Sequence, residues 1–288
     1  MLEVVGVSKY FGGYKVLDNI SFTLGRGRAA VLIGRNGSGK TTLLRCVAGL
    51  LRYEGFISIE GVDVSRDPVN ARKRIGYLPQ IPPVKGDITG YEIFDFYTDL
   101  HGIDLDADKW FEMFGLEDAM DLPLDGYSGG MRQRLFLMMA IAHEPVLTIL
   151  DEPMNNLDSL GKTLLVDIIN NWKKMGRSFL LSGHRLTDFI VYADEVILLD
   201  DGRIIYHGSI APLFEVLGFG RIHIYSPNGS LEDVARAIGG ELLDRNRLII
   251  HASDIHMVLK SIVDMGIRSF FLEEPTIDAI IARLKGDE

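Results

Sequence analysis

The sequence has a single cysteine, Cys46, and no long apolar run. One cysteine cannot form an internal disulfide, which fits a reducing compartment. The longest apolar stretch, from Leu135 to Ala142, is far too short to span a bilayer. Residues Met1 to Val5 have neither a basic leader nor an apolar core, so we expect no signal peptide. If the protein works at a membrane, another chain must supply the part that spans it.

Basic residues are also comparatively few. The chain has 30 lysines and arginines against 40 aspartates and glutamates, which gives a formal charge of -10 at pH 7. This balance argues against a broad phosphate-binding face, so we expect no nucleic acid partner. A length of 288 residues allows one large domain, alone or with a small appendage.

Strand and helix patterns alternate along the first part of the chain. The predicted strands cover residues 4–7, 21–24, 29–33, 56–59, 147–150, 178–181 and 195–199. A helix is predicted directly after residue 40 and another over about 159–174. This alternation predicts an α/β core. Helical patterns near 91–100, near 107–114 and after Gly130 predict a helical insertion over about residues 81–140.

The pattern changes near residue 220. The later elements are expected as a strand at 222–224, a helix over 231–238, a hairpin over 241–251, a helix over 255–263 and a strand over 267–272. The order β-α-β-β-α-β is that of the ferredoxin-like split motif. The hairpin should turn near Arg245-Asn246, and Thr276 should cap a final helix. We therefore expect two domains, residues 1–219 and a small α+β domain over 220–288.

A glycine-rich loop lies between a predicted strand and a predicted helix. Residues 34–41, Gly-Arg-Asn-Gly-Ser-Gly-Lys-Thr, fit the phosphate-binding pattern G-x-x-x-x-G-K-[ST]. The glycines let the backbone wrap around phosphate, and the helix N-terminus directs N–H groups at it. Lys40 would reach the β- and γ-phosphates, and the Thr41 hydroxyl would bind Mg²⁺. The residues of this segment predicted to bind ATP are Gly34, Arg35, Asn36, Gly37, Ser38, Gly39, Lys40, Thr41 and Thr42.

A phosphate-binding loop alone also fits small-molecule kinases and GTPases, and later motifs distinguish between these classes. Residues 127–134, Tyr-Ser-Gly-Gly-Met-Arg-Gln-Arg, closely resemble the LSGGQ signature of the ABC ATPases. The strand over 147–150 ends in Asp151-Glu152-Pro153, like the Walker B motif, and this motif order is specific to that family. Gln80 resembles its Q-loop, Asn156-Leu157-Asp158 its D-loop and Ser182-Gly183-His184 its switch-histidine loop. The resemblance extends from about residue 2 to 215.

The signature residues suit a second anion site. Ser128 offers a small hydroxyl, and Gly129 and Gly130 offer bare N–H groups at the start of a predicted helix. In the family this site faces the P-loop of a second subunit, so that ATP joins two ATPase domains head-to-tail. The chain has one P-loop and one signature, so the resemblance implies a dimer with a second copy or a homologous subunit. The resemblance of residues 156–158 to the D-loop further implies that Asp158 is a nucleotide-binding residue.

Two adjacent carboxylates end the strand over 147–150, where a Mg²⁺–phosphate site needs negative charge. The resemblance implies that Asp151 holds Mg²⁺ through water, together with Thr41 and Gln80. It also implies that Glu152 is the general base for the attacking water and that His184 contacts the γ-phosphate. A positioned base contributes about 10²–10⁴ in rate. The predicted catalytic residues are Lys40, Gln80, Glu152 and His184.

One position resembles the family less specifically, and several others differ from the residues usual in it. Phe11 resembles the aromatic residue that stacks on adenine, although a hydrophobic residue at a strand end is the alternative. Tyr127 replaces the usual leucine of the signature and Met131 the usual glutamine. Residues 154–158, Met-Asn-Asn-Leu-Asp, depart from the usual Thr-Ser-Gly-Leu-Asp, with Asn156 at the glycine position.

Residues 88–97, Met131 and the C-terminal segment resemble exporters whose ATPase subunits pair with separately encoded membrane subunits. We therefore expect an ATP- and Mg²⁺-dependent ATPase on the cytoplasmic face of the cell membrane, held there by an integral membrane transporter subunit. Apolar residues over 81–100 are expected partly to pack within the insertion and partly to receive a helix of that subunit. A soluble ABC ATPase acting in assembly is the alternative. For the C-terminal domain, a packing role and a regulatory role both stay open.

Overall fold

The computed structural model describes most of the chain. The described residues are 1–82, 86–155, 157–189, 192–210, 213, 221–225, 231–251, 261–262, 265, 270–273 and 276–285. The chain divides into two compact units, Met1–His184 with Asp188–His207 and Arg185–Thr187 with Gly208–Glu288. The domain boundary predicted at 219/220 lies outside the described residues, as does Asn156.

The first unit contains two sheets, of which the first is antiparallel. In the order β2-β1-β4-β5, its strands are β2 (Tyr14–Leu24), β1 (Leu2–Phe11), β4 (Glu54–Ile59) and β5 (Val62–Asp63). Leu2, Val4 and Val7 of β1 are buried, while Glu3 and Val5 are exposed. This alternation places the apolar side chains on one face of the sheet.

The second sheet has six strands in the order β10-β9-β3-β8-β7-β6. They are β10 (Arg203–Ser209), β9 (Glu195–Asp200), β3 (Ala29–Gly34), β8 (Ser178–Gly183), β7 (Leu147–Leu150) and β6 (Ile75–Leu78). The five strands from β9 to β6 are parallel. All residues of β3, β7 and β8 are buried, as expected for a sheet covered on both faces. Because parallel strands end at the same edge, the loops after β3, β7 and β8 meet there.

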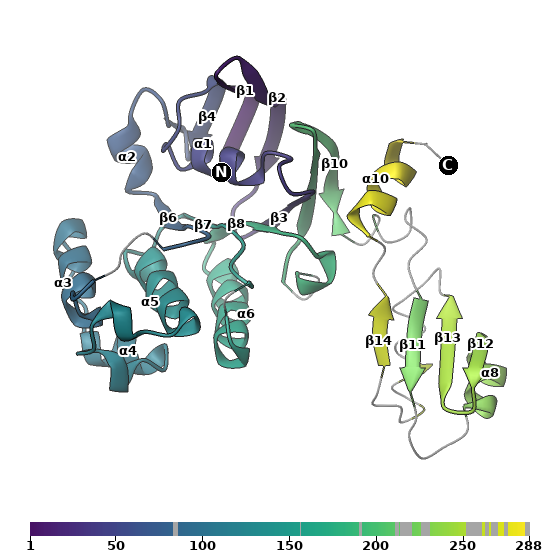
Figure 1. Ribbon diagram of the computed structural model, residues 1–288. Coiled ribbons are helices and arrows are strands. Elements are labelled where there is room, and N and C mark those ends of the chain that lie inside the picture. Colours follow the sequence, from purple (N-terminus) through teal and green to yellow (C-terminus); the bar gives the residue numbers. More distant parts are fainter. Residues whose placement is uncertain are drawn as a thin grey trace. The chain divides into compact units, whose positions relative to one another are not determined.

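Helices cover both faces of this central sheet, and others form the insertion. The helices up to residue 188 are α1 (Lys40–Val47), α2 (Pro68–Arg72), α3 (Gly90–His101), α4 (Ala107–Met113), α5 (Gly129–Ala142) and α6 (Ser159–Lys174), with short 3-10 turns at Glu117–Ala119, Leu124–Gly126 and Leu186–Asp188. Helix α3 packs against α4 and α5 in the insertion. Figure 1 shows α1 and the first sheet on one side of the central sheet, and α5 and α6 on the other. The α/β core with a helical insertion is therefore confirmed.

The main hydrophobic core lies between the two sheets and around α1. Leu43, Leu44 and Val47 of α1 pack in one cluster with residues such as Val4 and Leu32. Cys46 belongs to the same cluster and is fully buried, and burial raises the pKa of its thiol to about 12. The only cysteine is therefore a protonated core residue at neutral pH.

The second unit contains a four-stranded antiparallel sheet in the order β12-β13-β11-β14. Its elements are β11 (Arg221–Tyr225), α8 (Glu232–Ile238), β12 (Glu241–Asp244), β13 (Arg247–His251), β14 (Phe270–Glu273) and α10 (Ile277–Lys285). Strand β13 separates β11 from β12, as in a split β-α-β motif. The hairpin turns at Arg245-Asn246, as predicted, and Thr276 Oγ1 accepts a hydrogen bond from the N–H of Ala279 at 3.3 Å. Most of the helix predicted over 255–263 lies outside the described residues.

A small core supports this second sheet. It is formed by Ile222, Ile224, Leu231, Leu248, Ile250 and Ile262. Across the described part of both units, no helix combines the length and the apolar character that crossing a membrane requires.

Candidate functional site

The phosphate-binding loop joins β3 to α1 and depends on its glycines. Gly37 and Gly39 have φ values of 83° and 106°, a region that other residues rarely adopt. A Cβ atom on Gly34 would lie 2.2 Å from the carbonyl oxygen of Leu199, so a side chain is excluded there as well. No side chain caps the N-terminus of α1. The loop and the helix therefore present backbone N–H groups to an anion.

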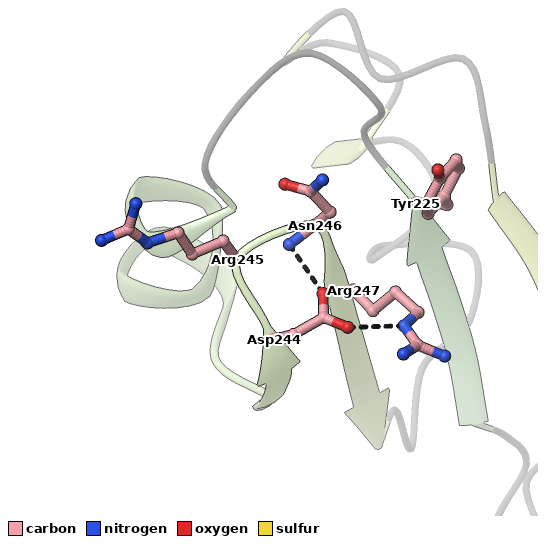
Figure 2. Close-up of a pocket in the computed structure, with 5 residues that line it drawn as sticks. All are labelled: Tyr225, Asp244, Arg245, Asn246 and Arg247. Carbon is pink, nitrogen blue, oxygen red and sulfur yellow. Dashed lines mark hydrogen bonds and ion pairs between the residues drawn. The ribbon is translucent and has the colours of Figure 1, made fainter.

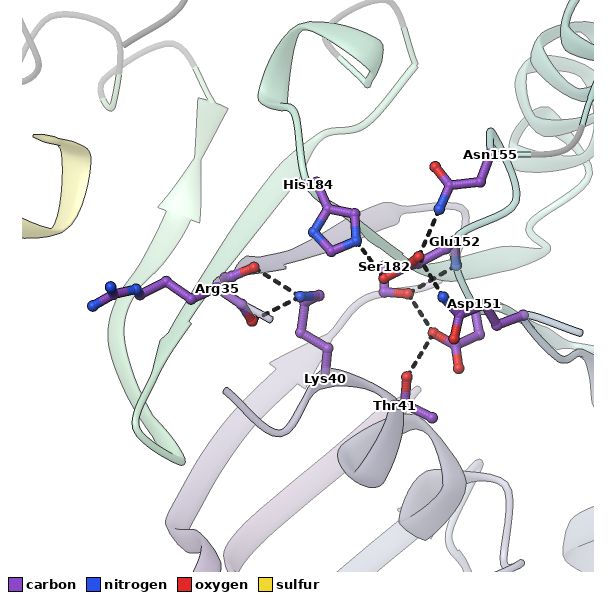
Figure 3. Close-up of polar contacts among 10 residues, drawn as sticks. Arg35, Lys40, Thr41, Asp151, Glu152, Asn155, Ser182 and His184 are labelled. Atoms are coloured by element: carbon purple, nitrogen blue, oxygen red, sulfur yellow. Dashed lines mark hydrogen bonds and ion pairs between the residues drawn. The ribbon is translucent and has the colours of Figure 1, made fainter. Parts of the chain in front are cut away.

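Lys40 begins α1 and is buried, with 5% of its surface exposed. Its Nζ donates to the carbonyl oxygens of Gly34 at 2.7 Å and Arg35 at 3.0 Å (Figure 3). Burial lowers the pKa of Lys40, while the carboxylates of Glu152 and Asp151 oppose this shift. The ammonium group is thus held against the loop and within the field of the two carboxylates predicted to act in metal binding and catalysis.

Asp151 directly follows β7 and is almost fully buried. Its Oδ1 accepts hydrogen bonds from Thr41 Oγ1 at 3.2 Å and from Ser182 Oγ at 2.7 Å. Its Oδ2 is buried and has no hydrogen-bond partner among the described residues. A buried carboxylate oxygen without a partner is costly, so another polar group belongs beside it. A carboxylate and a hydroxyl together offer the oxygen ligands that Mg²⁺ prefers.

Three side-chain donors surround the carboxylate of Glu152. Its Oε2 accepts hydrogen bonds from Gln80 Nε2 at 2.7 Å and from Asn155 Nδ2 at 2.6 Å. Its Oε1 lies 2.6 Å from His184 Nε2. Figure 3 shows His184 and Asn155 reaching this carboxylate from different sides. The structure therefore brings the predicted residues Gln80, Glu152 and His184 together at one edge of the central sheet.

The backbone at Glu152 is unusual, because its φ of 51° lies in the left-handed region. That conformation costs a non-glycine residue on the order of 1–2 kcal/mol. The N–H of Glu152 donates to Ser182 Oγ at 2.9 Å, and the same hydroxyl donates to Asp151. Ser182 thus fixes both acidic residues. The sequence analysis assigned no role to Ser182 or Asn155, although both lie inside motifs that it identified.

The signature residues lie at the start of α5. Ser128 is the N-cap, and its Oγ accepts a hydrogen bond from the N–H of Met131 at 3.2 Å. A Cβ atom on Gly129 would meet no atom within 4 Å, so the space in front of this helix end is open. In the described part of the chain, no hydrogen bond joins Ser128, Gly129 or Gly130 to the phosphate-binding loop.

Two further predicted nucleotide-binding residues, Asp158 and Phe11, lie at the ends of helix α6 and strand β1. Asp158 is the N-cap of α6, where it accepts a hydrogen bond from the N–H of Gly161 at 2.8 Å. Phe11 ends β1 and is 47% exposed, and the Lys9 ammonium lies 4.8 Å from the centre of its ring. The ring of Phe11 is therefore accessible to a ligand.

A groove adjoins Gln80, where residues following β6 face α3 and α5. Its cavity measures about 490 Å³. The apolar residues that line it include Leu50, Pro79, Ile81, Tyr97, Phe136 and Met139. Ile81 is 75% exposed, whereas Ile93 and Phe94 of α3 are buried inside the helical insertion. The apolar residues over 81–100 thus divide between the interior and an accessible surface, apart from Pro83 and Val84, which lie outside the described residues.

A second cavity, of about 560 Å³, lies at the hairpin of the second unit and is lined by Tyr225 and residues 244–247. Asp244 accepts hydrogen bonds from the N–H of Asn246 at 2.9 Å and from Arg247 Nε at 2.7 Å. Figure 2 shows that Arg245 points away from Tyr225 and Arg247. The polar side chains therefore do not converge on one point, and the residues that line this cavity do not indicate a ligand or a reaction for the second unit.

Known proteins resemble the chain over most of its length. A family model described as ABC transporter matches residues 17–155. The chain is 30% identical over 304 residues to the daunorubicin resistance ATP-binding protein DrrA3 of Streptomyces coeruleorubidus, covering 100% of this chain and 96% of that protein. It is 30% identical over 298 residues to the Nod factor export ATP-binding protein I of Sinorhizobium fredii, covering 100% and 86%.

The fold has solved counterparts as well. One structure, described as the ATP binding subunit of an ABC transporter, matches with a TM-score of 0.69 at 30% identity and covers 74% of this chain and 91% of that chain. The similarity thus extends far beyond the phosphate-binding loop. If the chain were a P-loop kinase or a GTPase, this extended similarity to ABC ATPase subunits would not be expected. The chain belongs to the family of ABC transporter ATP-binding subunits, and it is an ATPase.

Proposed function

We propose that this ATPase uses Mg²⁺ and two shared ATP sites to drive export through a separate membrane subunit. The observation that carries the chemical part is the cluster in which Gln80, Asn155 and His184 surround Glu152, next to Asp151 and Thr41. Positioned carboxylates and phosphate-cradling N–H groups are the parts that phosphoryl transfer to water requires.

In the proposed mechanism, each side chain has one task. The loop N–H groups and Lys40 hold the β- and γ-phosphates of ATP, replacing the carbonyl contacts that Lys40 makes in the structure. Glu152 accepts the proton of the attacking water. His184 donates to the γ-phosphate, which keeps the transferred group beside that water.

Mg²⁺ would be held by Thr41, Gln80 and, through water, Asp151. The buried Oδ2 of Asp151 supports this assignment because it has no partner among the described residues. When bound, Mg²⁺ neutralises charge that develops on the phosphates. Ser182 keeps Asp151 oriented through its 2.7 Å hydrogen bond.

Two shared sites are supported by the lack of any hydrogen bond, among the described residues, between the signature and the phosphate-binding loop. Ser128, Gly129 and Gly130 form the start of a 14-residue helix with open space beside it. An uncovered helix N-terminus can bind phosphate. We infer that this end binds the ATP held by the Lys40 of a second copy, or of a homologous subunit, in a head-to-tail dimer. Phe11 would stack on the adenine of a bound ATP, and Asp158 would lie at the subunit interface.

The groove beside Gln80 supports a membrane partner. Its exposed apolar residues, with Ile81 at 75% exposure, suit the apolar face of a short helix. A helix bound there would contact Pro79 and Ile81, the neighbours of Gln80. A movement of that helix could therefore shift Gln80, which donates a hydrogen bond to Glu152. We infer that an integral membrane subunit supplies this helix and holds the ATPase at the cytoplasmic face of the membrane. Residues 220–288 would form an independent small domain.

Export, rather than import, is supported by the names of the relatives, since one confers daunorubicin resistance and another exports Nod factor. The test is purification of the chain from its native membranes, followed by identification of the protein that accompanies it. We expect a multi-span membrane protein, and expect the pair to extrude substrate from cells in an ATP-dependent way. Recovery with soluble assembly factors alone would favour the assembly ATPase instead.

A further inference from the structure

The side chain of Asn155 contacts Glu152, although none of the sequence motifs gives Asn155 a role. Its Nδ2 lies 2.6 Å from Oε2 of Glu152, and both residues belong to the loop that follows β7. The main chain already closes the turn in this loop, because the N–H of Asn155 donates to the carbonyl oxygen of Glu152 at 3.2 Å. The side-chain amide is therefore not needed to shape the turn.

The hydrogen bonds of Glu152 leave little room for water at Oε2. That oxygen accepts from both Gln80 and Asn155, and an oxygen of a carboxylate has two lone pairs. Under the proposed function, Gln80 turns to the metal and His184 to the γ-phosphate when ATP binds. Asn155 has no role in binding the metal or the phosphate, so among the described donors it can keep its hydrogen bond to Glu152. The departure of Gln80 then leaves one lone pair of Oε2 free to accept a hydrogen bond from water.

We propose that Asn155 is a positioning residue for ATP hydrolysis, which holds the Glu152 carboxylate through Oε2 while Oε2 or Oε1 receives the proton of water. This inference rests on the proposed role of Glu152 as general base. A hydrogen bond to a charged group is about twice as strong as one between neutral groups. An amide at this place therefore restrains the carboxylate without competing for its proton.

The first test replaces Asn155 with alanine in the full-length protein. We expect kcat to fall about tenfold, as for the loss of one charge-assisted hydrogen bond, with KM for ATP, ATP affinity and thermal stability unchanged. Asn70→Ala is the matched control, because it removes an amide contact to Asp67 of 2.8 Å on the exposed helix α2 and should leave kcat unchanged. A loss of ATP affinity or of stability in Asn155→Ala would overturn the proposal in favour of a structural role.

The second test uses Asn155→Asp, which keeps the size of the side chain but replaces the donor beside Oε2 with a second carboxylate. Like charges in contact repel, so this carboxylate should displace that of Glu152. We expect kcat to fall further than in Asn155→Ala, again with ATP affinity unchanged. A kcat equal to that of the unmodified protein would overturn the proposal.

Glu152→Gln separates this inference from the function on which it rests. If Glu152→Gln abolishes hydrolysis but Asn155→Ala hydrolyses at the unmodified rate, the positioning role fails and the proposed function stands. If Glu152→Gln hydrolyses at the unmodified rate, both fail.

Discussion

The Nε2 atom of His184 lies 2.6 Å from Oε1 of Glu152. The two residues follow β8 and β7, which are adjacent parallel strands paired in register at Leu150 and Leu181. Parallel pairing brings the carboxyl ends of both strands to the same edge, so residues distant in the sequence meet there without any further fold element. The same edge receives Lys40 and Thr41 after β3.

The first prediction concerns the shared ATP sites. Ser128→Arg places a large cation at the open start of α5 and should prevent ATP-dependent dimerisation, while ATP binding to the single chain stays largely intact. Dimer formation is measured by light scattering and ATP affinity by nucleotide titration. A mixture with Lys40→Ala chains should form at most one intact composite site per heterodimer. Full ATPase activity of Ser128→Arg alone would rule out the shared geometry.

The groove beside Gln80 gives the second prediction. Ile81→Glu puts a charge on an exposed lining residue, and burying that charge under a partner helix is unfavourable. We expect weaker association with the membrane subunit and loss of transport, with basal ATPase unchanged. Val69→Glu is the control, since Val69 is 63% exposed on α2. Undisturbed association in Ile81→Glu would argue against this docking site.

The contact between Tyr127 and Gly90 gives the third prediction. The Tyr127 hydroxyl donates to the carbonyl oxygen of Ala119 at 2.7 Å, and a Cβ atom on Gly90 would lie 2.0 Å from that hydroxyl. Gly90→Ala should therefore lower the free energy of unfolding by about 1–3 kcal/mol through overpacking. Gly126→Ala is the control, because a Cβ there meets no atom within 4 Å. Equal denaturation midpoints for the two variants would contradict the contact.

The fourth prediction concerns pH and His143. Its Nδ1 lies 2.8 Å from the Tyr97 hydroxyl and its Nε2 3.1 Å from the carbonyl oxygen of Ile75, while its ring stacks on His101. Burial, and then the charge of His101, lower the pKa of His143 from 6.5 to about 4. Between pH 6.5 and about 4, His143 is therefore protonated in the unfolded chain but stays neutral in the folded chain.

Stability should therefore be complete above pH 6.5 and fall as the pH drops toward about 4. The loss attributable to His143 should be roughly 2 kcal/mol after allowance for its partial exposure. Chemical denaturation at several pH values measures this loss. His143→Gln keeps a donor and an acceptor but cannot titrate, so its curve should be flatter. The same pH dependence in His143→Gln would show that other groups cause it.

Much of this arrangement can be predicted from the sequence. Strands β3, β7 and β8 are apolar runs, and the glycine pattern and the Asp-Glu pair stand directly after two of them. The motifs therefore lead to Lys40, Asp151, Glu152 and His184, because local sequence determines both the strand and the loop that follows it.

Other features could not be predicted, because they depend on contacts between distant segments. Strand β6 is interrupted by Gly76, which weakens its pattern, yet a Cβ at Gly76 would lie 1.8 Å from the carbonyl oxygen of Ala140. The glycine is thus required by the approach of α5 rather than by a turn. The end of the helix predicted after residue 40 is a further example, because α1 ends at Val47, before Gly49 with its left-handed φ of 67°. Likewise, nothing in the spacing of Asn155 shows that its amide reaches Glu152.

The fifth prediction tests the central claim, that Glu152 is the base for ATP hydrolysis. Glu152→Gln keeps the shape of the side chain and loses the base, so ATP should bind and bring two chains together but remain uncleaved. Glu144→Gln is the matched control, since that carboxylate is exposed and pairs with Arg177 at 3.0 Å. The measurement is steady-state phosphate release alongside ATP-dependent dimerisation. The account predicts no steady-state release with a stable dimer for Glu152→Gln, and release at the rate of the unmodified protein would contradict it.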